Sequence, residues 1–275
     1  MTKRLLILLL LLCSSVLGQV PYQKPMMGQQ IDWSNPLSKG LVGYWLMNEG
    51  TGNVVADLSG NGNTGTLVAD THWVPGKFGP CLSLDGDGDW VNTKEQVTSI
   101  GVGKSFTVSM FVNTVNAGAT GTLLSSNSST SDRFSIEINS VGAAVAGLYN
   151  GAGYIQNVRS GAGSIVSNRL YHIVYTTDTV NAFMYVDAIA SNTSQNPTTA
   201  LNAGTRIGAR VSGLSPFNGT IDDVMIYNRA LTPGEITELY INPFGMFRPT
   251  FSVWWYSGIG GEPPATFGQV IMISN

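Results

Sequence analysis

Short apolar runs that alternate with polar residues recur along most of the chain, and this pattern is typical of β-strands rather than helices. We expect strands at residues 41–47, 81–84, 90–91, 106–112, 133–138, 143–149, 170–176, 182–186, 205–209 and 220–228. Their length and spacing predict an all-β protein, a two-sheet antiparallel β-sandwich. A single short helix is expected near its C-terminal end.

The sequence contains clear signals for the start of this helix. Thr232 is a suitable N-cap, Pro233 favours the first helical position, and Glu235 at the third position can close a capping box. Helical spacing then puts three residues on one apolar face, Ile236, Leu239 and Tyr240. The helix is expected over residues 233–241.

Two adjacent carboxylates, Asp222 and Asp223, lie inside the apolar strand that precedes the helix. Strict alternation predicts that Asp222 shares a face with Val224 and Ile226, and that Asp223 shares the other with Ile221, Met225 and Tyr227. A carboxylate among apolar neighbours needs a hydrogen-bond donor or a cation. The alternative is a carboxylate at a strand end that accepts hydrogen bonds from loop amides.

Three segments resemble the laminin-G-like jelly-roll domains of the concanavalin-A-like lectin/glucanase superfamily. The sequence GTIDDVMIYNRALTPGEI (219–236) resembles the closing strand and helix of that family, and residues 41–67 and 76–91 resemble its first third. Residues 105–112 and 182–188 match its middle strands more loosely. The resemblance covers about residues 39–241 and implies a jelly roll. Members of the superfamily serve as lectins, adhesins, enzyme accessory modules and enzymes, so the fold alone assigns no function.

The first 18 residues have the composition of a signal peptide. Lys3 and Arg4 precede an uninterrupted apolar run at 5–12, and small or tolerated residues follow at 16–18. Cleavage is expected between Gly18 and Gln19, which predicts a secreted protein. Lipidation at Cys13 is the alternative, but Leu12 stands where a small residue is expected.

The rest of the chain divides into three parts. Residues 19–38 contain three prolines and form an expected extended N-terminal arm, residues 39–242 form the jelly-roll domain, and residues 243–275 form an aromatic C-terminal tail. The tail is expected either to expose an assembly contact or to fold back over the edge of the sandwich. Cys81 is the only cysteine left after cleavage, so no intramolecular disulfide is expected, and its apolar surroundings predict burial.

The composition narrows the range of partners. Only 11% of the 275 residues are charged and the net charge is −3, so no basic surface for nucleic acid is expected. No segment after the signal peptide is long and apolar enough to span a membrane.

A polar loop at residues 57–65, DLSGNGNTG, offers the oxygen ligands that calcium prefers. The family resemblance implies that this loop lies beside the closing strand and shares a structural calcium ion with it. We therefore expect Asp57, Asn61 and Asp222 as calcium ligands. The alternative is an Asx-turn in which the Asp57 carboxylate accepts hydrogen bonds from backbone N–H groups of its own loop. The nearby DGDGD sequence (85–89) lacks the glycine and glutamate of a helix-loop-helix calcium loop and predicts a tight turn.

No catalytic residues are expected, and the chain is predicted not to be an enzyme. Retaining hydrolases of this superfamily carry Glu-x-Asp-x-x-Glu on one strand, whereas the segment beginning at Glu137 lacks both later carboxylates. His172 is expected on a sheet face and His72 in a loop, with no nucleophile pattern near either.

Glycan recognition needs only an aromatic face and a few amide groups. Trp73, Tyr149, Asn150 and Tyr154 are the candidate ligand-binding residues, with core or rim packing as the alternative. The sequence predicts an exported, non-catalytic recognition module, stabilised by calcium, that binds glycans or surface proteins. The alternatives are a structural or adhesive component of a larger surface or virion assembly and, less favoured, a glycoside hydrolase.

Overall fold

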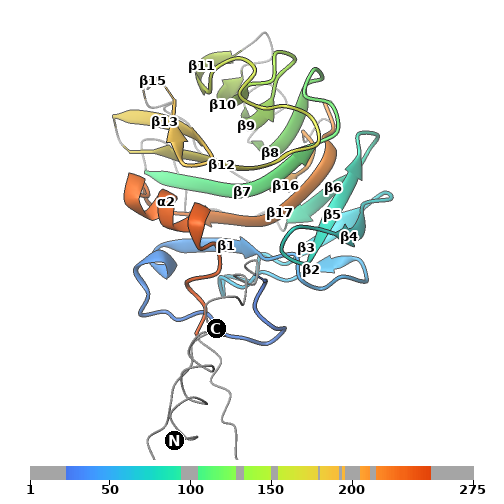
Figure 1. Cartoon of the computed structure of the whole chain (residues 1–275), viewed down its shortest axis with the longest axis vertical. Coiled ribbons are helices and arrows are strands. Elements are labelled where there is room, and N and C mark those ends of the chain that lie inside the picture. The colour runs from blue at the N-terminus through green and yellow to red at the C-terminus, as the bar shows by residue number, and fades with distance from the viewer. Residues whose placement is uncertain are drawn as a thin grey trace, which may run out of the picture.

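The computed structural model describes residues 23–93, 105–127, 133–149, 154–178, 180–191, 194–195, 205–210 and 215–248. Within them two antiparallel sheets pack face to face, and the helix expected from the sequence is present (Figure 1). The prediction of an all-β sandwich with one short C-terminal helix is confirmed.

The larger sheet has nine strands and contains the two longest strands of the fold. Its order is β14 (Ile189–Ala190), β13 (Asn181–Val186), β12 (Leu170–Thr177), β7 (Phe106–Thr114), β17 (Asn218–Tyr227), β5 (Pro80–Asp85) and β4 (His72–Pro75). Two further strands pair off this path, β1 (Leu41–Trp45) with β17 and β15 (Ser194–Gln195) with β13.

The smaller sheet has eight strands. Its order is β11 (Tyr154–Arg159), β10 (Ala144–Tyr149), β9 (Arg133–Ile138), β8 (Gly121–Asn127), β16 (Thr205–Ile207), β6 (Trp90–Thr93), β3 (Gly65–Val68) and β2 (Val54–Val55). The edge strands are therefore β11 and β2 in this sheet, and β14, β15, β4 and β1 in the other.

The main core lies between the two sheets. On β9, for example, Phe134, Ile136 and Ile138 alternate toward this core and are each at most 2% exposed. Trp45 and Ile221 face them from the nine-stranded sheet and are fully buried. Each such side chain contributes about 1.5–3 kcal/mol of burial free energy, so this layer supplies most of the stability.

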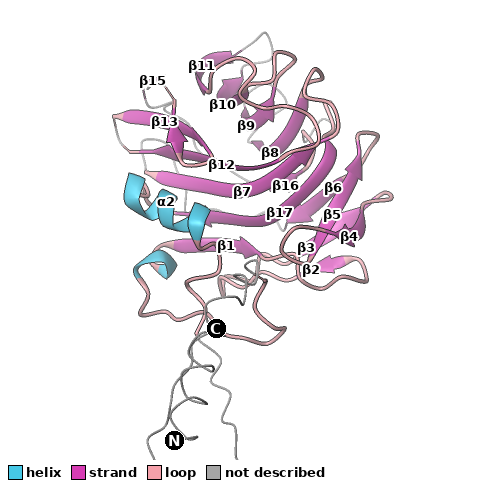
Figure 2. Cartoon of the chain, in the orientation of Figure 1, coloured by secondary structure: helices cyan, strands magenta, loops and turns pink. Residues whose placement is uncertain are grey.

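A second apolar cluster lies on the other face of the nine-stranded sheet. It is covered by the N-terminal arm, the short 3-10 helix η1 (Pro36–Ser38), helix α2 (Pro233–Ile241) and residues 243–248 (Figure 2). Ile31 of the arm forms a β-bridge with Phe247, and both are buried. Residues 23–38 and 243–248 thus pack against the sandwich together, while the aromatic residues from 249 onward lie outside the described residues.

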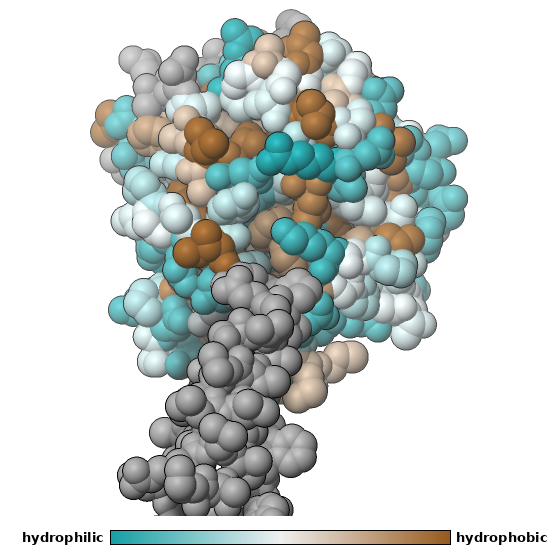
Figure 3. Space-filling view, viewed as in Figure 1, coloured by the Kyte–Doolittle hydropathy of each residue, from teal (hydrophilic) through white to brown (hydrophobic). Residues whose placement is uncertain are grey.

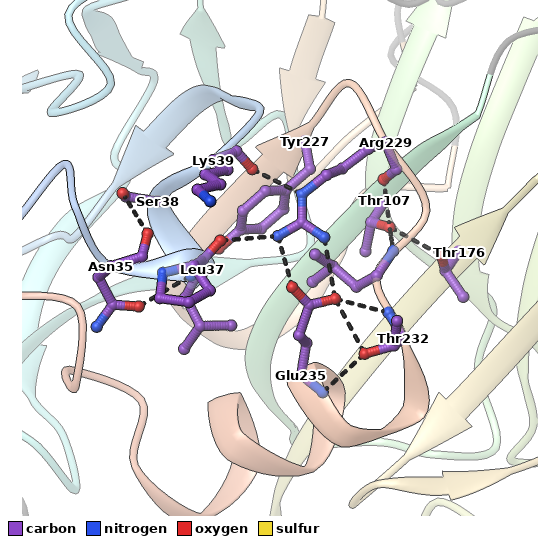
Figure 4. Close-up of polar contacts among 12 residues, drawn as sticks. Asn35, Leu37, Ser38, Lys39, Thr107, Thr176, Tyr227, Arg229, Thr232 and Glu235 are labelled. Atoms are coloured by element: carbon purple, nitrogen blue, oxygen red, sulfur yellow. Dashed lines mark hydrogen bonds and ion pairs between the residues drawn. The ribbon is translucent and has the colours of Figure 1, made fainter.

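Helix α2 has the capping box expected from the sequence. The Thr232 hydroxyl accepts the Glu235 N–H at 3.3 Å, and the Glu235 carboxylate accepts the Thr232 N–H at 2.9 Å. Figure 4 shows how Arg229 extends this contact, because its guanidinium binds both Glu235 and the backbone oxygen of Lys39 beside η1. Ile236 and Leu239 are buried as expected, but Tyr240 is 39% exposed, because it lies at the margin of the buried face.

Some local predictions were wrong. His72, expected in a loop, lies on β4 together with Trp73. The DGDGD turn joins β5 to β6, which belong to different sheets. Strands β3, β8 and β11 were missed because GTLV, GTLLSSN and YIQNVR show no regular alternation of apolar and polar residues. Cys81 is a free, buried thiol, as expected.

Candidate functional site

A β-bulge in β17 changes which faces its two carboxylates occupy. Asp222 pairs with Phe111 and Met225 with Ser109, so β17 has one extra residue here, and Asp223 has a left-handed φ of 52°. Ile221 and Val224 both face the main core, whereas Asp222 and Asp223 contact residues on the outer face. The alternation predicted from the sequence is therefore wrong between these positions.

The arm supplies a cation to this pair of carboxylates. The Lys24 ammonium donates to the Asp222 carboxylate, to the backbone oxygen of Met47 at 2.9 Å, and to that of Pro80. The Lys24 and Asp222 side chains are only 2% and 5% exposed. Burial raises the pKa of Asp222 to about 7, and the neighbouring ammonium opposes this rise.

Asp223 is even more completely enclosed. Its Oδ1 accepts the Tyr44 hydroxyl at 2.8 Å, while Oδ2 has no hydrogen-bond partner among the described residues. Burial, and then the negative charge of Asp222, raise the pKa of Asp223 to about 8. Three ionisable groups thus share one dry site, which ties the arm to β17 and is closed to a substrate.

A serine and a histidine lie on the same covered face. Ser109 Oγ and His172 Nε2 are 2.8 Å apart, and each residue is 1% exposed. The imidazole stacks on Phe111 at a centroid distance of 4.6 Å, and burial lowers the pKa of His172 to about 3. A nucleophile must reach its substrate, so this buried pair serves packing.

The predicted calcium ligands make other contacts in this structure. Asp57 Oδ1 accepts the N–H groups of Tyr44 and Ser59 at 3.0 and 2.9 Å, and Oδ2 accepts that of Asn63 at 2.8 Å. The Asn61 amide donates to the backbone oxygen of Val42. These are the bonds that the Asx-turn alternative expects, and Asp222 is paired with Lys24. The calcium role of the three residues stays a prediction.

Three other carboxylates converge in a way that could hold a metal ion. Oxygens of Asp70, Asp85 and Asp89 all lie within 4.8 Å of one another, the only such group among the described residues. Asp89 is buried and accepts the backbone N–H groups of Asp70 and Asp85 at 3.1 and 2.9 Å. Burial is the main cause of its raised pKa.

The predicted glycan-binding residues do not form one described surface. Trp73 is half-buried against the main core, and its indole N–H donates to the backbone oxygen of Gly52 at 2.8 Å. Tyr149 and Tyr154 pair across β10 and β11, but their side chains, and the whole of Asn150, lie outside the described residues. Their role in binding stays a prediction.

A hollow that the sequence did not predict lies between the arm and the segment after β1. This arm hollow has a volume of about 590 Å³ and is lined by residues 25–31, Trp33, Leu46, Asn48, Glu49, Ala56, Leu58 and Gly60. Its volume falls within the range of about 300–1,000 Å³ that is usual for ligand sites.

The backbone of the arm holds one aromatic ring at the rim of this hollow. Trp33 is 51% exposed, although Ile31, two residues earlier, is buried. An Asx-turn fixes the backbone around it, because Asp32 Oδ1 accepts the N–H and the hydroxyl of Ser34 at 3.0 and 2.7 Å. The Asp32 N–H donates to the backbone oxygen of Met246 at 2.8 Å, so the turn is anchored to the sandwich.

Two exposed methionines extend the apolar rim of the arm hollow. Met26 and Met27 are 70% and 73% exposed, in a turn closed by the Gln29 N–H on the Met26 oxygen at 3.0 Å. On the face drawn in Figure 3, by contrast, the apolar spots outside the grey atoms are interleaved with polar residues. Exposed apolar side chains gathered at a hollow indicate a contact surface.

Comparisons with known proteins are consistent with this architecture. Domain 4 of AbnA, an extracellular arabinanase from Geobacillus stearothermophilus solved in complex with arabinotriose, is 19% identical with a TM-score of 0.57. The alignment covers 73% of this chain and 98% of that one. The binding domain of Paraclostridial Mosquitocidal Protein 1 is 18% identical with a TM-score of 0.61, covering 76% and 53%. A Trypanosoma rangeli sialidase in complex with sialic acid is 20% identical with a TM-score of 0.56, covering 75% and 33%.

These similarities establish the fold, and the chain spans only about half or a third of the second and third proteins. No curated protein sequence matches the chain. No helix in the described part of the chain is long and apolar enough to cross a membrane. A family model described as the concanavalin A-like lectin/glucanases superfamily matches residues 85–237, more than half of the chain. The chain therefore belongs to the concanavalin A-like lectin/glucanases superfamily.

Proposed function

We propose that the protein is a non-catalytic recognition module that binds a glycan in the arm hollow. The exposed indole of Trp33, on a backbone fixed by its Asx-turn, is the observation that carries this proposal. An exposed tryptophan gains hydrophobic free energy when a ligand covers it. Because its backbone is already fixed, less conformational entropy is lost when the ligand binds. The C–H face of a sugar ring packs well on such an indole.

Polar groups around the hollow suit sugar hydroxyls. Asn48 and the exposed Gln30 contribute amide groups to its lining. The Glu49 carboxylate is less available, because Oε1 accepts the Ala56 N–H at 2.9 Å and Oε2 is buried. Ring hydroxyls bonded to the two amides would fix the orientation of a sugar stacked on Trp33.

The structural neighbours support recognition rather than any particular ligand. One is a domain solved with arabinotriose and another is the binding domain of a mosquitocidal protein, and both share this fold. A surface protein is the competing ligand, because Met26 and Met27 add apolar area at the rim. The amide groups of Asn48 and Gln30 favour a hydroxylated ligand.

The contacts of Glu137 support a non-catalytic role. Its two carboxylate oxygens accept Arg210 Nε and Nη2 at 2.8 and 2.9 Å, and its side chain is 3% exposed. A general acid must contact the glycosidic oxygen, and a nucleophile the anomeric carbon. A buried carboxylate whose two oxygens are bound to two guanidinium nitrogens can contact neither the glycosidic oxygen nor the anomeric carbon.

Export and calcium belong to the same proposal. The positive and apolar segments at the N-terminus support secretion. Calcium has two candidate positions, the predicted set Asp57, Asn61 and Asp222 and the converging Asp70, Asp85 and Asp89. Two exposed carboxylates close to a third buried one repel each other, and a divalent cation would remove that repulsion.

A glycan array probed with the mature protein, and then with Trp33→Ala, tests the function. We expect a defined set of neutral oligosaccharides to bind and the variant to lose at least about tenfold in affinity, since a stacking contact contributes roughly 0.5–1.5 kcal/mol beyond its buried area. Tyr240→Ala removes an exposed aromatic ring from α2 and is the matched control. Equal glycan binding by the wild type and Trp33→Ala would show that the glycan does not bind at Trp33.

A further inference from the structure

A second hollow lies where the free edges of the two sheets meet. This edge hollow has a volume of about 620 Å³ and is lined by residues 141, 143, 157–162, 190 and 191. It combines the end strand of the eight-stranded sheet, β11, with the end strand of the nine-stranded sheet, β14. In Figure 1, β11 lies at the end of the molecule opposite the blue N-terminal arm, so the two hollows are separate.

The free edge of β11 presents backbone hydrogen-bond groups to this hollow. The Ser160 N–H donates to the Ala144 oxygen at 2.9 Å, which makes residues 144 and 160 a hydrogen-bonded pair. Because such pairs alternate along an antiparallel ladder, the N–H and C=O groups of Asn157 and Arg159 point away from β10. No strand of the described chain pairs with that side of β11.

The chain after β11 also keeps the hollow open. Ser160 Oγ accepts the Ala144 N–H at 2.9 Å and lies 2.6 Å from Ser164 Oγ, which holds the turn at 160–164 against β10. Gly142, between the lining residues Val141 and Ala143, has a φ of 64°, and a Cβ there would come within 2.6 Å of the Ile165 oxygen. Backbone contacts therefore fix this part of the lining.

The charge of the edge hollow is positive. Arg159 is exposed, and among the described residues it has no ion pair, hydrogen bond or ring contact. None of the described residues that line the hollow is acidic, and Glu137, two strands away in the same register, is already bound by Arg210. Arg159 can therefore direct its full charge and its planar donor pair at a ligand.

We propose that the edge hollow binds the carboxylate of an acidic sugar, with Arg159 as the anion-binding residue. The hydroxyls of the sugar would bond to the Asn157 side chain and to the outward backbone groups of β11. An acidic peptide that adds a strand to β11 is the competing ligand. The sugar is favoured because the hollow, at about 620 Å³, has the volume of a small-ligand site, and the chain turns away from the edge at residues 160–164. This site is independent of glycan binding at Trp33.

The test is a calorimetric titration of the mature full-length protein with a trigalacturonate and with its neutral methyl ester. We expect the charged trimer to bind at least about tenfold more tightly, because a charge-assisted pair contributes roughly 1.5–3 kcal/mol. Arg159→Gln should reduce the affinity for the acid to that for the ester, and Arg159→Lys should restore part of it. Arg169→Gln, which also removes an exposed guanidinium, is the matched control and should change nothing.

Three results would overturn this site. Equal affinity for the acid and the ester would show that the carboxylate does not contribute to binding. An unchanged affinity in Arg159→Gln would show that the carboxylate binds at another residue. Arg159-dependent binding of a polyglutamate peptide with no binding of the trigalacturonate would replace the sugar with a peptide strand. Trp33→Ala, tested in parallel, should leave trigalacturonate affinity unchanged, so this experiment fails or succeeds separately from the proposed function.

Discussion

Lys24 and Asp222 lie 198 positions apart and form an ion pair in which both side chains are buried. The pair joins the N-terminal arm to the bulge of β17 and places the arm against the outer face of the larger sheet. The arm in turn carries Trp33 and one wall of the arm hollow. The geometry of the candidate binding surface therefore depends on a buried ion pair, whose lysine directly precedes Pro25 in the lining.

Removal of the cation alone should destabilise the fold strongly. Lys24→Met leaves the carboxylates of Asp222 and Asp223 buried without a positive charge, which costs about 3–5 kcal/mol. Urea unfolding of the mature protein should show this loss, and the double variant Lys24→Met/Asp222→Asn should recover a large part of it. Arg169→Met removes an exposed ion pair and should cost no more than about 1 kcal/mol. An equal loss of stability in Lys24→Met and Arg169→Met would show that the buried ion pair contributes no more than an exposed one.

The two buried carboxylates also predict a dependence of stability on pH. The pKa of Asp223 is raised from 3.8 to about 8 and that of Asp222 to about 7, so between pH 4 and 8 the folded state binds more protons than the unfolded state. The free energy of unfolding must then fall as pH rises through this window. His172, whose pKa is lowered from 6.5 to about 3, has the opposite effect below pH 6.5. The fall should therefore be clearest between pH 6.5 and 8.

Denaturant unfolding at pH 6.5, 7.25 and 8 checks this pH effect. Asp223→Asn removes the group with the highest carboxyl pKa and should flatten the curve, whereas an exposed control, Asp87→Asn, should leave the slope unchanged. Stability that rises across this interval in the wild-type protein would contradict the ionisation assigned to the pair.

The helix and the strands were predictable to very different degrees. The bounds of α2 are those expected, because its N-cap, proline and capping glutamate are local signals within four residues. The bulge at Asp223 has no such signal, since many sequences alternate without one, and its left-handed φ follows from pairing with β7. The partner of Asp222 also came from a distant part of the chain, and no spacing rule connects it with Lys24.

The candidate site was predicted less well than the fold. The sequence DWSNP around Trp33 did contain a usable signal, because an aromatic residue between two Asx-type turn formers is placed outward on a fixed backbone. The arm was instead interpreted as an extended segment because it lacks periodicity. The hollow itself depends on the packing of the arm against residues 46–60, which only the tertiary structure supplies.

Calcium should raise the melting temperature of the mature protein. At a hundred times its dissociation constant an ion stabilises the folded state by about 2.7 kcal/mol. For a domain of this size that corresponds to roughly 5–10 °C, and magnesium should substitute poorly. Asp57→Asn and Asp89→Asn, measured with calcium and with a chelator, identify which candidate position binds the ion. Identical melting curves in calcium, magnesium and chelator would refute the calcium proposal.

No glycoside hydrolysis is expected, because Glu137 is held by Arg210 and no second carboxylate of the family motif follows it. Reducing-sugar release from soluble β-glucans by the mature protein should stay at the level of a no-enzyme blank. Turnover that disappears in Glu137→Gln would contradict the non-catalytic assignment.

The most direct test of glycan recognition at the arm hollow is an NMR titration of the indole N–H signals of the mature protein with the best neutral oligosaccharide from the array. The Trp33 signal, assigned from Trp33→Phe, should shift saturably and give the dissociation constant of the complex. The Trp73 signal should stay in place, because its N–H is already bound to the Gly52 oxygen. Saturable binding with no shift at Trp33 would contradict the central claim.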